Sequence, residues 1–169
     1  FLDSASLRSS IVYHAKTLGY VPSSARAAKA TVDVTLNTND STATMPDGTV
    51  FNTTVDDVSF QFSTIQSFTK SNTGNSIPFV GVDIFEGTFI TTRYTVDTSD
   101  IDQRFLLTDN RADTSTLIVK VQTSSTDSSS NTFTDATDIT QVTAGSNVFF
   151  LQEVEAGLFE VYFGDGVIG

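Results

Sequence analysis

Residues 30–36 read Ala-Thr-Val-Asp-Val-Thr-Leu and give the clearest indication of the fold. Apolar side chains occupy every second position of this stretch and alternate with threonine or aspartate. Successive side chains of a β-strand point to opposite faces, so a period of two predicts a strand with one buried face. We therefore expect this stretch to form a half-buried strand of a sheet.

The period of two recurs along much of the remaining chain. The 14 Phe residues, together with abundant Thr and Val, favour pleated, half-buried surfaces. No helical pattern separates these stretches, which argues against a parallel sheet built from strand-helix-strand units. We predict a mainly β fold of the α+β class, an antiparallel or mixed β-rich domain. Its further strands are expected at residues 58–62, 80–84, 90–96, 104–107, 117–121, 148–151 and 159–163.

Turn signals separate several of the predicted strands. Pro46-Asp47-Gly48 fits a type I turn with proline at its second position and glycine at its fourth. Residues 97–102 are expected to turn as well, and residues 124–132 to form a polar loop. Glu86-Gly87 is expected to break or bulge the strand that precedes it.

The first twenty residues follow the period of an α-helix. Asp3 or Ser4 can cap its start, Gly19 suits the left-handed position after its end, and Pro22 follows where a helix cannot continue. We expect one amphipathic helix over residues 4–18, packed by its apolar face against the β-rich domain. The apolar positions of that face are Leu7, Ile11, Ala15 and Leu18.

The length of 169 residues suits one compact domain with a sizeable core. We interpret residues 1–169 as a single β-rich segment, in which a boundary near residues 108–115 would separate lobes of residues 1–108 and 115–169. The chain begins with Phe1 and its last residues have no terminal character. We therefore expect it to be a fragment of a longer polypeptide.

The charge and composition argue against several classes of partner. The net charge is -11, from 20 acidic and nine basic side chains. Nucleic acids and anionic membrane surfaces attract clustered Lys and Arg, so we expect neither as a partner. The chain has no cysteine, which rules out disulfides and thiolate metal sites within it. No apolar run approaches the roughly 20 residues that a membrane helix needs.

His14, the single histidine, lies at the edge of the predicted helix's apolar face. We interpret it as a packed or half-exposed structural residue, since no second histidine or cysteine accompanies it. Asp97, Asp100 and Asp102 form the densest acidic cluster. Calcium binds oxygen ligands in such loops, but this spacing does not match a helix-loop-helix calcium loop, so a solvated turn is the preferred interpretation.

Two further groups of residues suggest chemistry without specifying it. Glu153 and Glu155 would share a face of a strand, whereas glycosidases place two carboxylates across a cleft. Gly164-Asp165-Gly166 resembles a phosphate cradle but lacks its lysine, and a tight turn explains it better. We therefore assign no catalytic residue, no cofactor-binding residue and no metal ligand, and predict a structural protein instead of an enzyme.

Three stretches in order along the chain resemble one protein family. Residues 7–30, LRSSIVYHAKTLGYVPSSARAAKA, look like baseplate wedge proteins of T-even-type and cyanophage-type myoviruses. Residues 45–51, MPDGTVF, are similar to a Pro-x-Gly-Thr-x-Phe segment of the broader baseplate J-like family. Residues 159–169, FEVYFGDGVIG, resemble that family's FGDG signature and are the most specific of the three. Residues 63–143 carry no such motif.

The resemblance implies a structural role in the virion. Such proteins form the wedges around the tail hub, hold the baseplate before infection, and rearrange when the sheath contracts. It implies other wedge subunits and the tail hub as partners, a homodimer in the full-length protein, assembly in the host cytoplasm and location in the tail baseplate. The family carries over no catalytic residues.

Two other functions are compatible with the composition. A receptor- or glycan-binding β module of a tail fibre or adhesin would suit a Thr- and Ser-rich chain with long polar loops, although glycan sites often use Trp and this chain has none. A hydrolase with dispersed carboxylates is the second alternative. Selective binding on a glycan array, or turnover abolished by replacing one acid, would distinguish them.

Overall fold

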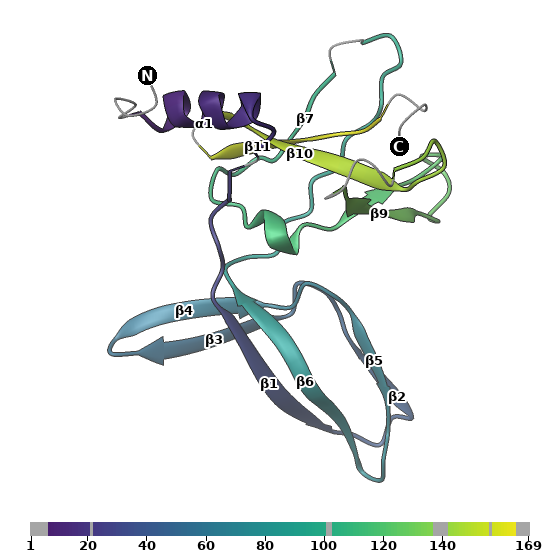
Figure 1. Ribbon diagram of the computed structural model, residues 1–169. Helices are drawn as coiled ribbons and strands as arrows, with labels where there is room; N and C mark the ends of the chain where they lie inside the picture. Colours follow the sequence, from purple (N-terminus) through teal and green to yellow (C-terminus); the bar gives the residue numbers. More distant parts are fainter. Residues whose placement is uncertain (1–6, 21, 101–102, 137–141, 156, 165–169) are drawn as a thin grey trace. The chain divides into compact units, whose positions relative to one another are not determined.

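The structure, a computed structural model, describes residues 7–20, 22–100, 103–136, 142–155 and 157–164. Within these residues the chain is mostly β-structure with one α-helix near its N-terminus, which confirms the predicted fold class (Figure 1). The chain divides into unit 1, residues 1–26 and 92–169, and unit 2, residues 27–91. This division differs from the expected lobes of residues 1–108 and 115–169, because unit 2 is inserted between two segments of unit 1.

Unit 2 contains strands β1 to β6. Four of them form an antiparallel sheet in the order β1-β6-β4-β3, and β2 pairs with β5 in a separate two-stranded sheet. Residues 30–36 lie in β1, as predicted, with half-buried and exposed side chains alternating over most of the stretch. The strands are Lys29–Asn37 (β1), Thr42–Met45 (β2), Val50–Val55 (β3), Val58–Ser63 (β4), Phe68–Ser71 (β5) and Ser76–Glu86 (β6).

Strand β6 supplies most of the core of unit 2 and contains a β-bulge. A regular alternation over residues 80–84 would bury Val80, but this side chain is 69% exposed. The pairing with β1 shifts opposite Asp33, where Gly81 adopts a φ of +69° and donates its N–H to the Asp33 carboxylate at 2.7 Å. The bulge thereby keeps both halves of β6 facing one core. The buried core residues of unit 2 are Met45, Ile77, Phe79, Val82 and Ile84.

The turn after β2 differs from the predicted type I turn. The Thr49 N–H donates to the Pro46 carbonyl at 3.3 Å, so proline holds the first position and not the second. Gly48 then takes the third position with a φ of +75°. A positive φ at this position is the requirement of a type II turn, which explains the glycine.

Residues 90–96, predicted as a strand, are not part of any strand in the structure. Ile90 is 61% exposed and Val96 is 67% exposed. The alternation is present in the sequence, but no strand among the described residues pairs with this segment. The Tyr94 ring meets Phe105 edge to face at 5.6 Å, whereas Ile90 and Val96 remain exposed. The prediction was wrong because a sequence period does not supply a pairing partner.

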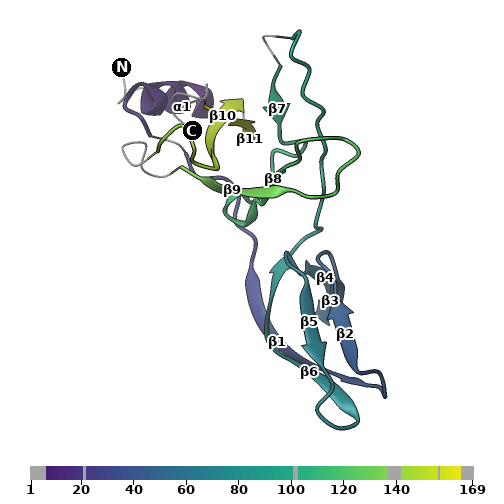
Figure 2. The same ribbon diagram turned by 90° about the vertical axis from the view of Figure 1, so that its right-hand side faces the viewer.

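Unit 1 contains helix α1, the 3-10 helix η2 and strands β7 to β11. Its sheet has the order β7-β11-β10-β9-β8, and it is mixed because β9 and β10 are parallel (Figure 2). The elements are Arg8–Thr17 (α1), Phe105–Leu106 (β7), Thr114–Thr116 (η2), Val119–Val121 (β8), Asn131–Asp135 (β9), Val148–Glu155 (β10) and Leu158–Tyr162 (β11).

The core of unit 1 lies on one face of strands β10 and β11. Phe159 is only 1% exposed there. The ring of Phe163 meets Phe105 and Phe133 edge to face, with centroid distances of 5.8 and 5.6 Å. Such aromatic contacts add to the stability that apolar burial gives. The buried residues clustered in this core are Phe149, Leu151 and Val161.

Helix α1 ends as the sequence predicts. Gly19 has a φ of +74°, and the Tyr20 N–H donates to the Ala15 carbonyl at 3.0 Å, which is the bond of a Schellman motif. The helix begins at Arg8, later than the expected residue 4. The expected caps Asp3 and Ser4 lie outside the described residues.

Candidate interaction surfaces

Helix α1 is joined to the sheet of unit 1 by an ion pair in which the carboxylate is buried and the arginine is 55% exposed. Nε and Nη2 of Arg8 donate to Oε1 and Oε2 of Glu153 on β10, both at 2.9 Å. The Glu153 side chain is fully buried, and its Oε1 also accepts the Gly157 N–H at 2.7 Å. Hydrogen bonding to Glu153 raises the pKa of Arg8. Because a buried carboxylate requires such partners, polar geometry sets the position of the helix.

The apolar stripe predicted for α1 remains exposed. Leu7, Ile11 and Leu18 are exposed by 66%, 47% and 81%, whereas Val12, on a neighbouring side of the helix, is 8% exposed. The expectation that this stripe packs against the β-rich domain is therefore wrong for these three residues, whereas the fourth predicted position, Ala15, is half-buried. Together with His14, these three residues follow steps of four, three and four, the spacing of a helix that packs against another element. We name Leu7, Ile11, His14 and Leu18 the α1 stripe.

A second buried carboxylate lies on the opposite face of the same sheet. Glu160 of β11 pairs across the strands with Gln152, whereas Glu153 pairs with Phe159, so the two glutamates point to opposite faces. Nε and Nη2 of Arg104 donate to Glu160, with the Nε bond at 2.9 Å, and Gln152 donates to it at 3.1 Å. On this face the arginine comes from the residue before β7, the edge strand that pairs with β11, whereas Arg8 comes from helix α1.

The β3–β4 hairpin of unit 2 extends beyond the four-stranded sheet as an arm, residues 51–62 (Figure 1). Strand β4 pairs with β6 only at Phe62 and Ser63, so no third strand flanks the outer part of the arm in the described structure. Opposed residues of an antiparallel pair share a face. The pairs on one face are Phe51 with Phe62, Thr53 with Phe60, and Val55 with Val58.

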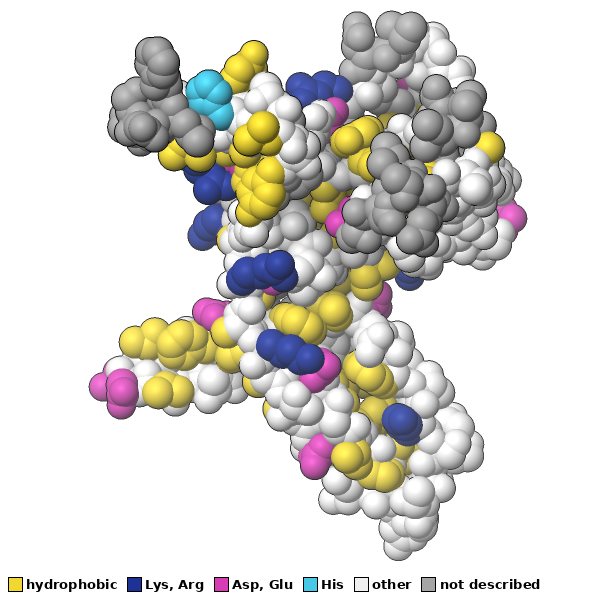
Figure 3. Space-filling view, in the orientation of Figure 1, with side chains coloured by type: hydrophobic (Ala, Val, Ile, Leu, Met, Phe, Trp, Pro, Cys, Tyr) yellow, Lys and Arg dark blue, Asp and Glu magenta, His cyan; other side chains and the backbone are white. Residues whose placement is uncertain are grey.

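Apolar residues continue along this face of the arm from the core of unit 2 to the tip. Phe51 and Phe62 pack against the core, whereas Val55 and Val58 near the tip are 55% and 54% exposed. Figure 3 shows hydrophobic side chains along the hairpin and acidic side chains at its tip. An isolated two-stranded hairpin has marginal stability in water, and exposed apolar patches commonly mark contacts with partners.

The tip of the arm is a two-residue turn made of two aspartates. Asp56 and Asp57 have φ values of 49° and 63°. Positive φ at both central positions defines the type I′ turn, which favours Asn-Gly on conformational grounds. Asp-Asp at this place adds two negative charges next to Val55 and Val58. The tip is therefore both apolar and acidic.

Charge is distributed unevenly along the chain. Residues 4–32, which include α1, contain four basic side chains and no acidic one. The rest of the chain contains 20 acidic and five basic side chains, so its charge of -15 and the +4 of residues 4–32 give the total of -11. The α1 stripe therefore lies in a basic segment of an acidic protein.

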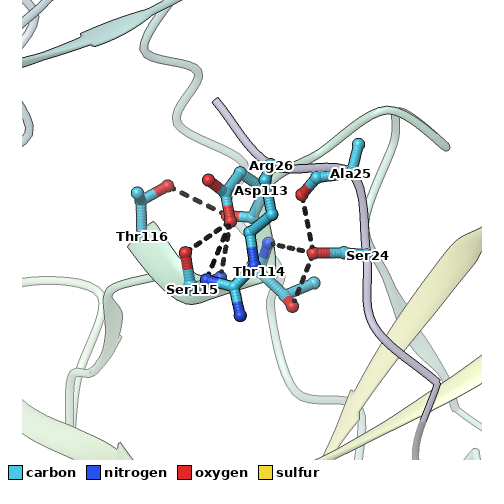
Figure 4. Close-up of polar contacts among 7 residues, drawn as sticks. All are labelled: Ser24, Ala25, Arg26, Asp113, Thr114, Ser115 and Thr116. Atoms are coloured by element: carbon cyan, nitrogen blue, oxygen red, sulfur yellow. Dashed lines mark hydrogen bonds and ion pairs between the residues drawn. The ribbon is translucent and has the colours of Figure 1, made fainter. Parts of the chain in front are cut away.

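A polar cluster fastens residues 24–26 to η2 within unit 1 (Figure 4). The Ser24 hydroxyl accepts the Thr114 N–H at 3.0 Å and donates to the Ala25 carbonyl at 2.9 Å. The Asp113 carboxylate caps η2 by accepting the Ser115 N–H at 2.9 Å. All of these bonds satisfy backbone or hydroxyl groups, so we interpret the cluster as a structural cap.

Two candidate sites from the sequence analysis, His14 and the Asp97 cluster, make contacts within the protein itself. His14 is half-buried on α1, and its ring meets Tyr13 edge to face at 6.0 Å. The Asp97 carboxylate accepts the hydroxyl and N–H of Ser99 at 2.6 and 2.9 Å, and these bonds lower the pKa of Asp97. It forms part of the predicted turn with Asp100, whereas Asp102 lies outside the described residues.

The other two candidates are only partly described. Glu153 is buried and paired with Arg8, as given above. Its predicted companion Glu155 ends β10 after a register shift, and the side chain of Glu155 lies outside the described part of the chain. Gly164 is described, but Asp165 and Gly166 are not.

The sequence analysis missed the arm and both buried glutamates. Val55-Asp56-Asp57-Val58 does carry a hairpin signal, because two turn residues separate two alternating stretches. The ion pairs have no comparable signal, since Arg8 and Glu153 are 145 residues apart in sequence. From sequence alone, a glutamate within an alternating strand is predicted to face solvent, because the partner that would allow its burial is not apparent.

Within the described residues, no group of three or more His, Cys, Asp or Glu side chains is arranged to hold a metal ion. The described part of the chain also contains no helix long and apolar enough to cross a membrane. Comparison with known proteins gives no family model that matches this chain and no match among curated proteins.

Proposed function

We propose that this chain is a structural segment of a contractile phage tail baseplate wedge, which contacts neighbouring wedge subunits around the tail hub. The observation that carries the proposal is the presence of two exposed apolar surfaces, the α1 stripe and the arm, on elements held in place by the fold. Proteins that function through repeated contacts need such surfaces, whereas a monomeric globular protein would bury them.

The way in which α1 is held supports an assembly role. Its position is set by the Arg8–Glu153 pair and by Val12, so the Leu and Ile side chains of the stripe remain free for a partner. An element that uses a polar bond for attachment can exchange its apolar contacts without leaving the sheet. This suits a wedge that holds one arrangement before infection and another after contraction.

The motif residues of the family resemblance are compatible with a scaffold. Residues 45–51 form the turn and strand start at the base of the arm, where Met45 and Phe51 pack in the core. Residues 159–161 lie in β11, where Phe159 and Val161 are buried and Glu160 binds Arg104. These positions form the fold of each unit, and the surfaces for partners lie beside them.

The proposal is tested by locating the protein in the virion. Antibodies raised against the 169-residue chain are applied to purified particles of the phage that encodes it, before and after induced sheath contraction. We expect label at the base of the tail in immuno-electron micrographs of both states. Label confined to fibres or capsid would contradict the proposal.

One observation favours the glycan-binding alternative. The rings of Phe150 and Tyr162 stack with centroids 5.2 Å apart, and Tyr162 is 42% exposed. A partly exposed aromatic pair of this kind is able to stack against a sugar ring. Selective binding to a glycan array that is lost on Tyr162→Ala and kept on Tyr13→Ala would favour this function over the wedge.

A further inference from the structure

We infer that the outer edge of β3 accepts an extended, basic strand of a neighbouring protein, which lengthens the sheet of unit 2 by one strand. The inference deepens the proposed function, on which it rests for the neighbour, a wedge subunit. Strand β4 pairs with one edge of β3, and no described strand pairs with the other (Figure 1). An unpaired edge offers its backbone N–H and C=O groups to an added strand of suitable chemistry.

The turn at the tip determines which backbone groups of β3 point outward. Val55 and Val58 close a two-residue turn, so they exchange hydrogen bonds with each other, and every second pair of the hairpin does the same. The Thr64 N–H donates to the Thr49 carbonyl at 3.1 Å, in step with this alternation. The intervening residues of β3 therefore direct their N–H and C=O groups away from β4. These outward-facing residues are Val50, Asn52 and Thr54. In the described part of the chain, no hydrogen bond reaches their backbone groups.

The outer edge of β3 lacks the features that protect the other sheet edges. Proteins commonly shield an edge with a short strand, a bulge, a proline or a charged side chain. Strands β7 and β8 have two and three residues, and β2 and β5 have four each. Strand β1 begins with Lys29 and contains the bulge near Asp33. Strand β3 has six residues in unbroken register, with no charge or proline among them, so its edge is open to another strand.

The charges around β3 favour a basic partner and oppose a second copy. Residues 46–63 contain three exposed aspartates, Asp47 before β3 and Asp56 and Asp57 after it, and no Lys or Arg. Among the described residues, none forms an ion pair with these three. If two β3 strands paired antiparallel about Asn52, Asp57 of each copy would lie opposite Asp47 of the other. Lys or Arg at that place would replace repulsion by attraction.

The side chains of β3 specify the pattern of the incoming strand. Opposed residues share a face of a sheet, and one face of β3 presents Phe51, Thr53 and Val55. Partner residues opposite these three should be apolar, and the alternate residues polar. The sheet of unit 2 is antiparallel, and an antiparallel partner would begin beside the tip. The partner is therefore an alternating strand with Lys or Arg at its N-terminal end.

The probe is the acetylated and amidated peptide Lys-Lys-Val-Thr-Val-Thr-Val-Thr, titrated into the 169-residue chain. Its lysines fall opposite the tip, its valines opposite the apolar face of β3, and its threonines opposite the outward-facing residues. Nuclear magnetic resonance measures the exchange of each backbone amide. We expect saturable protection of the Val50, Asn52 and Thr54 amides with a Kd of roughly 1 mM or lower, since main-chain bonds supply the affinity. No protection of these amides at about 5 mM peptide would overturn the inference.

N-methylation tests whether the backbone of the peptide pairs with β3. In the inferred register the threonine amides bond to β3 and the valine amides face away. A peptide N-methylated at its valines keeps every bond to β3 and should bind like the unmethylated peptide. A peptide N-methylated at its threonines has the same composition but loses these donors, so it should bind at least about tenfold more weakly. Equal binding of the two methylated peptides would overturn the inference.

The substitution Asn52→Pro tests the same edge from the side of the protein. Proline removes the outward N–H of residue 52 and no bond to β4, and edge strands tolerate proline where the N–H faces solvent. We expect peptide binding at least about tenfold weaker, with amide exchange in β4 unchanged. Asn52→Thr keeps the N–H and is the matched control, which should bind like the parent chain. Binding by Asn52→Pro at the strength of the parent would overturn the inference, and the methylated peptides give the same test without changing the protein.

A reversal of charge tests the choice of a basic partner. A peptide with Glu-Glu in place of Lys-Lys should bind roughly threefold or more weakly at low salt, the size typical of exposed charges. This difference should shrink on Asp56→Asn/Asp57→Gly, because Asn-Gly keeps the turn and removes its charges. Equal binding of both peptides to the parent chain would overturn the basic partner.

A second copy of the chain is the competing occupant. Protection of the Val50, Asn52 and Thr54 amides that grows with the concentration of the chain alone, and not with added peptide, would show self-pairing and overturn the inference. The inference and the proposed function fail separately, because strand binding is measured in solution and virion location by microscopy.

Discussion

Units 1 and 2 stabilise their sheets by different means. Unit 2 has strands of up to 11 residues in a regular antiparallel sheet, and the clustered residues of its core are apolar. One bulge in β6 keeps both halves of this strand directed toward that core. Unit 1 has a mixed sheet with short outer strands, and it buries Glu153 and Glu160 against arginines. In unit 1 the helix is held by an ion pair, so apolar side chains of α1 remain exposed. In unit 2 the exposed apolar side chains lie instead on the β3–β4 hairpin.

The largest expected effect comes from removing a core side chain in either unit. Phe159→Ala should lower the free energy of unfolding of unit 1 by about 3–5 kcal/mol, and Ile77→Ala that of unit 2 by about 2–5 kcal/mol, since both side chains are almost fully buried. Hydrogen exchange of backbone amides measures both units in one sample. Equal loss of protection in both units for either variant would show that the two cores are not independent.

The next effect separates the attachment of α1 from the stability of its sheet. Glu153→Gln retains the shape of the side chain but removes the charge that pairs with Arg8, and loss of a charged hydrogen bond costs about 1.5–3 kcal/mol. We expect faster amide exchange in α1, with smaller changes in β11 and none in unit 2. Glu86→Gln, at an exposed position of unit 2, is the charge-matched control. Unchanged exchange in α1 would mean that the ion pair does not hold the helix.

A smaller effect of opposite sign is expected at the arm. Asp56→Asn/Asp57→Gly places residues that adopt positive φ at lower cost in the same turn and should raise the free energy of unfolding of unit 2 by about 0.5–1 kcal/mol. Denaturant unfolding followed by exchange in β3 and β4 measures it. Asp47→Asn in the turn before β3 controls for loss of charge. A destabilised arm would show that the aspartates make native contacts that outweigh their strain.

The smallest effect is a difference in acid sensitivity. Hydrogen bonds to Ser99, Arg111 and Ser129 lower the pKa values of Asp97, Asp109 and Asp127 in unit 1, and bonds to Lys29 and Thr31 lower that of Asp83 in unit 2. A lowered pKa contributes stability that is complete above the ordinary value of 3.8 and is lost as the pH falls below it. Burial raises the pKa of Asp135, which acts in the opposite direction.

Unit 1 should therefore lose more stability than unit 2 as the pH falls below 3.8. Thermal unfolding at several pH values, with exchange to distinguish the units, measures the difference. Asp97→Asn should reduce the acid sensitivity of unit 1, and Asp83→Asn that of unit 2. Equal acid sensitivity in both units would contradict this use of the aspartates.

The sequence analysis predicted local structure better than pairing. The alternation of residues 30–36 and 159–161 does mark strands, and Gly19 does end the helix. Residues 90–96 show the same alternation but form no strand, because no strand in the described part of the chain pairs with them. The bulge at Gly81 was also missed, since a period of two contains no sign of an extra residue until the partner strand is known.

The surfaces were harder to predict than the strands. The predicted apolar face of α1 left out Val12, which is buried, and the burial of the predicted positions was inferred from the rule that apolar faces pack inward. That rule failed because Arg8 and Glu153 orient the helix differently. The arm could have been found from Val55-Asp56-Asp57-Val58, whereas its exposure depends on how far β4 extends past β6.

The amino-acid sequence by itself determined the mainly β character, the position of the helix end, the acidic charge with its basic segment, and the residue types of both surfaces. These follow from local sterics, side-chain period and composition, which act over a few residues. The tertiary structure decided which strands pair, which face of α1 is exposed, and that two glutamates are buried. Those outcomes depend on contacts between residues far apart in the chain, which local propensity does not encode.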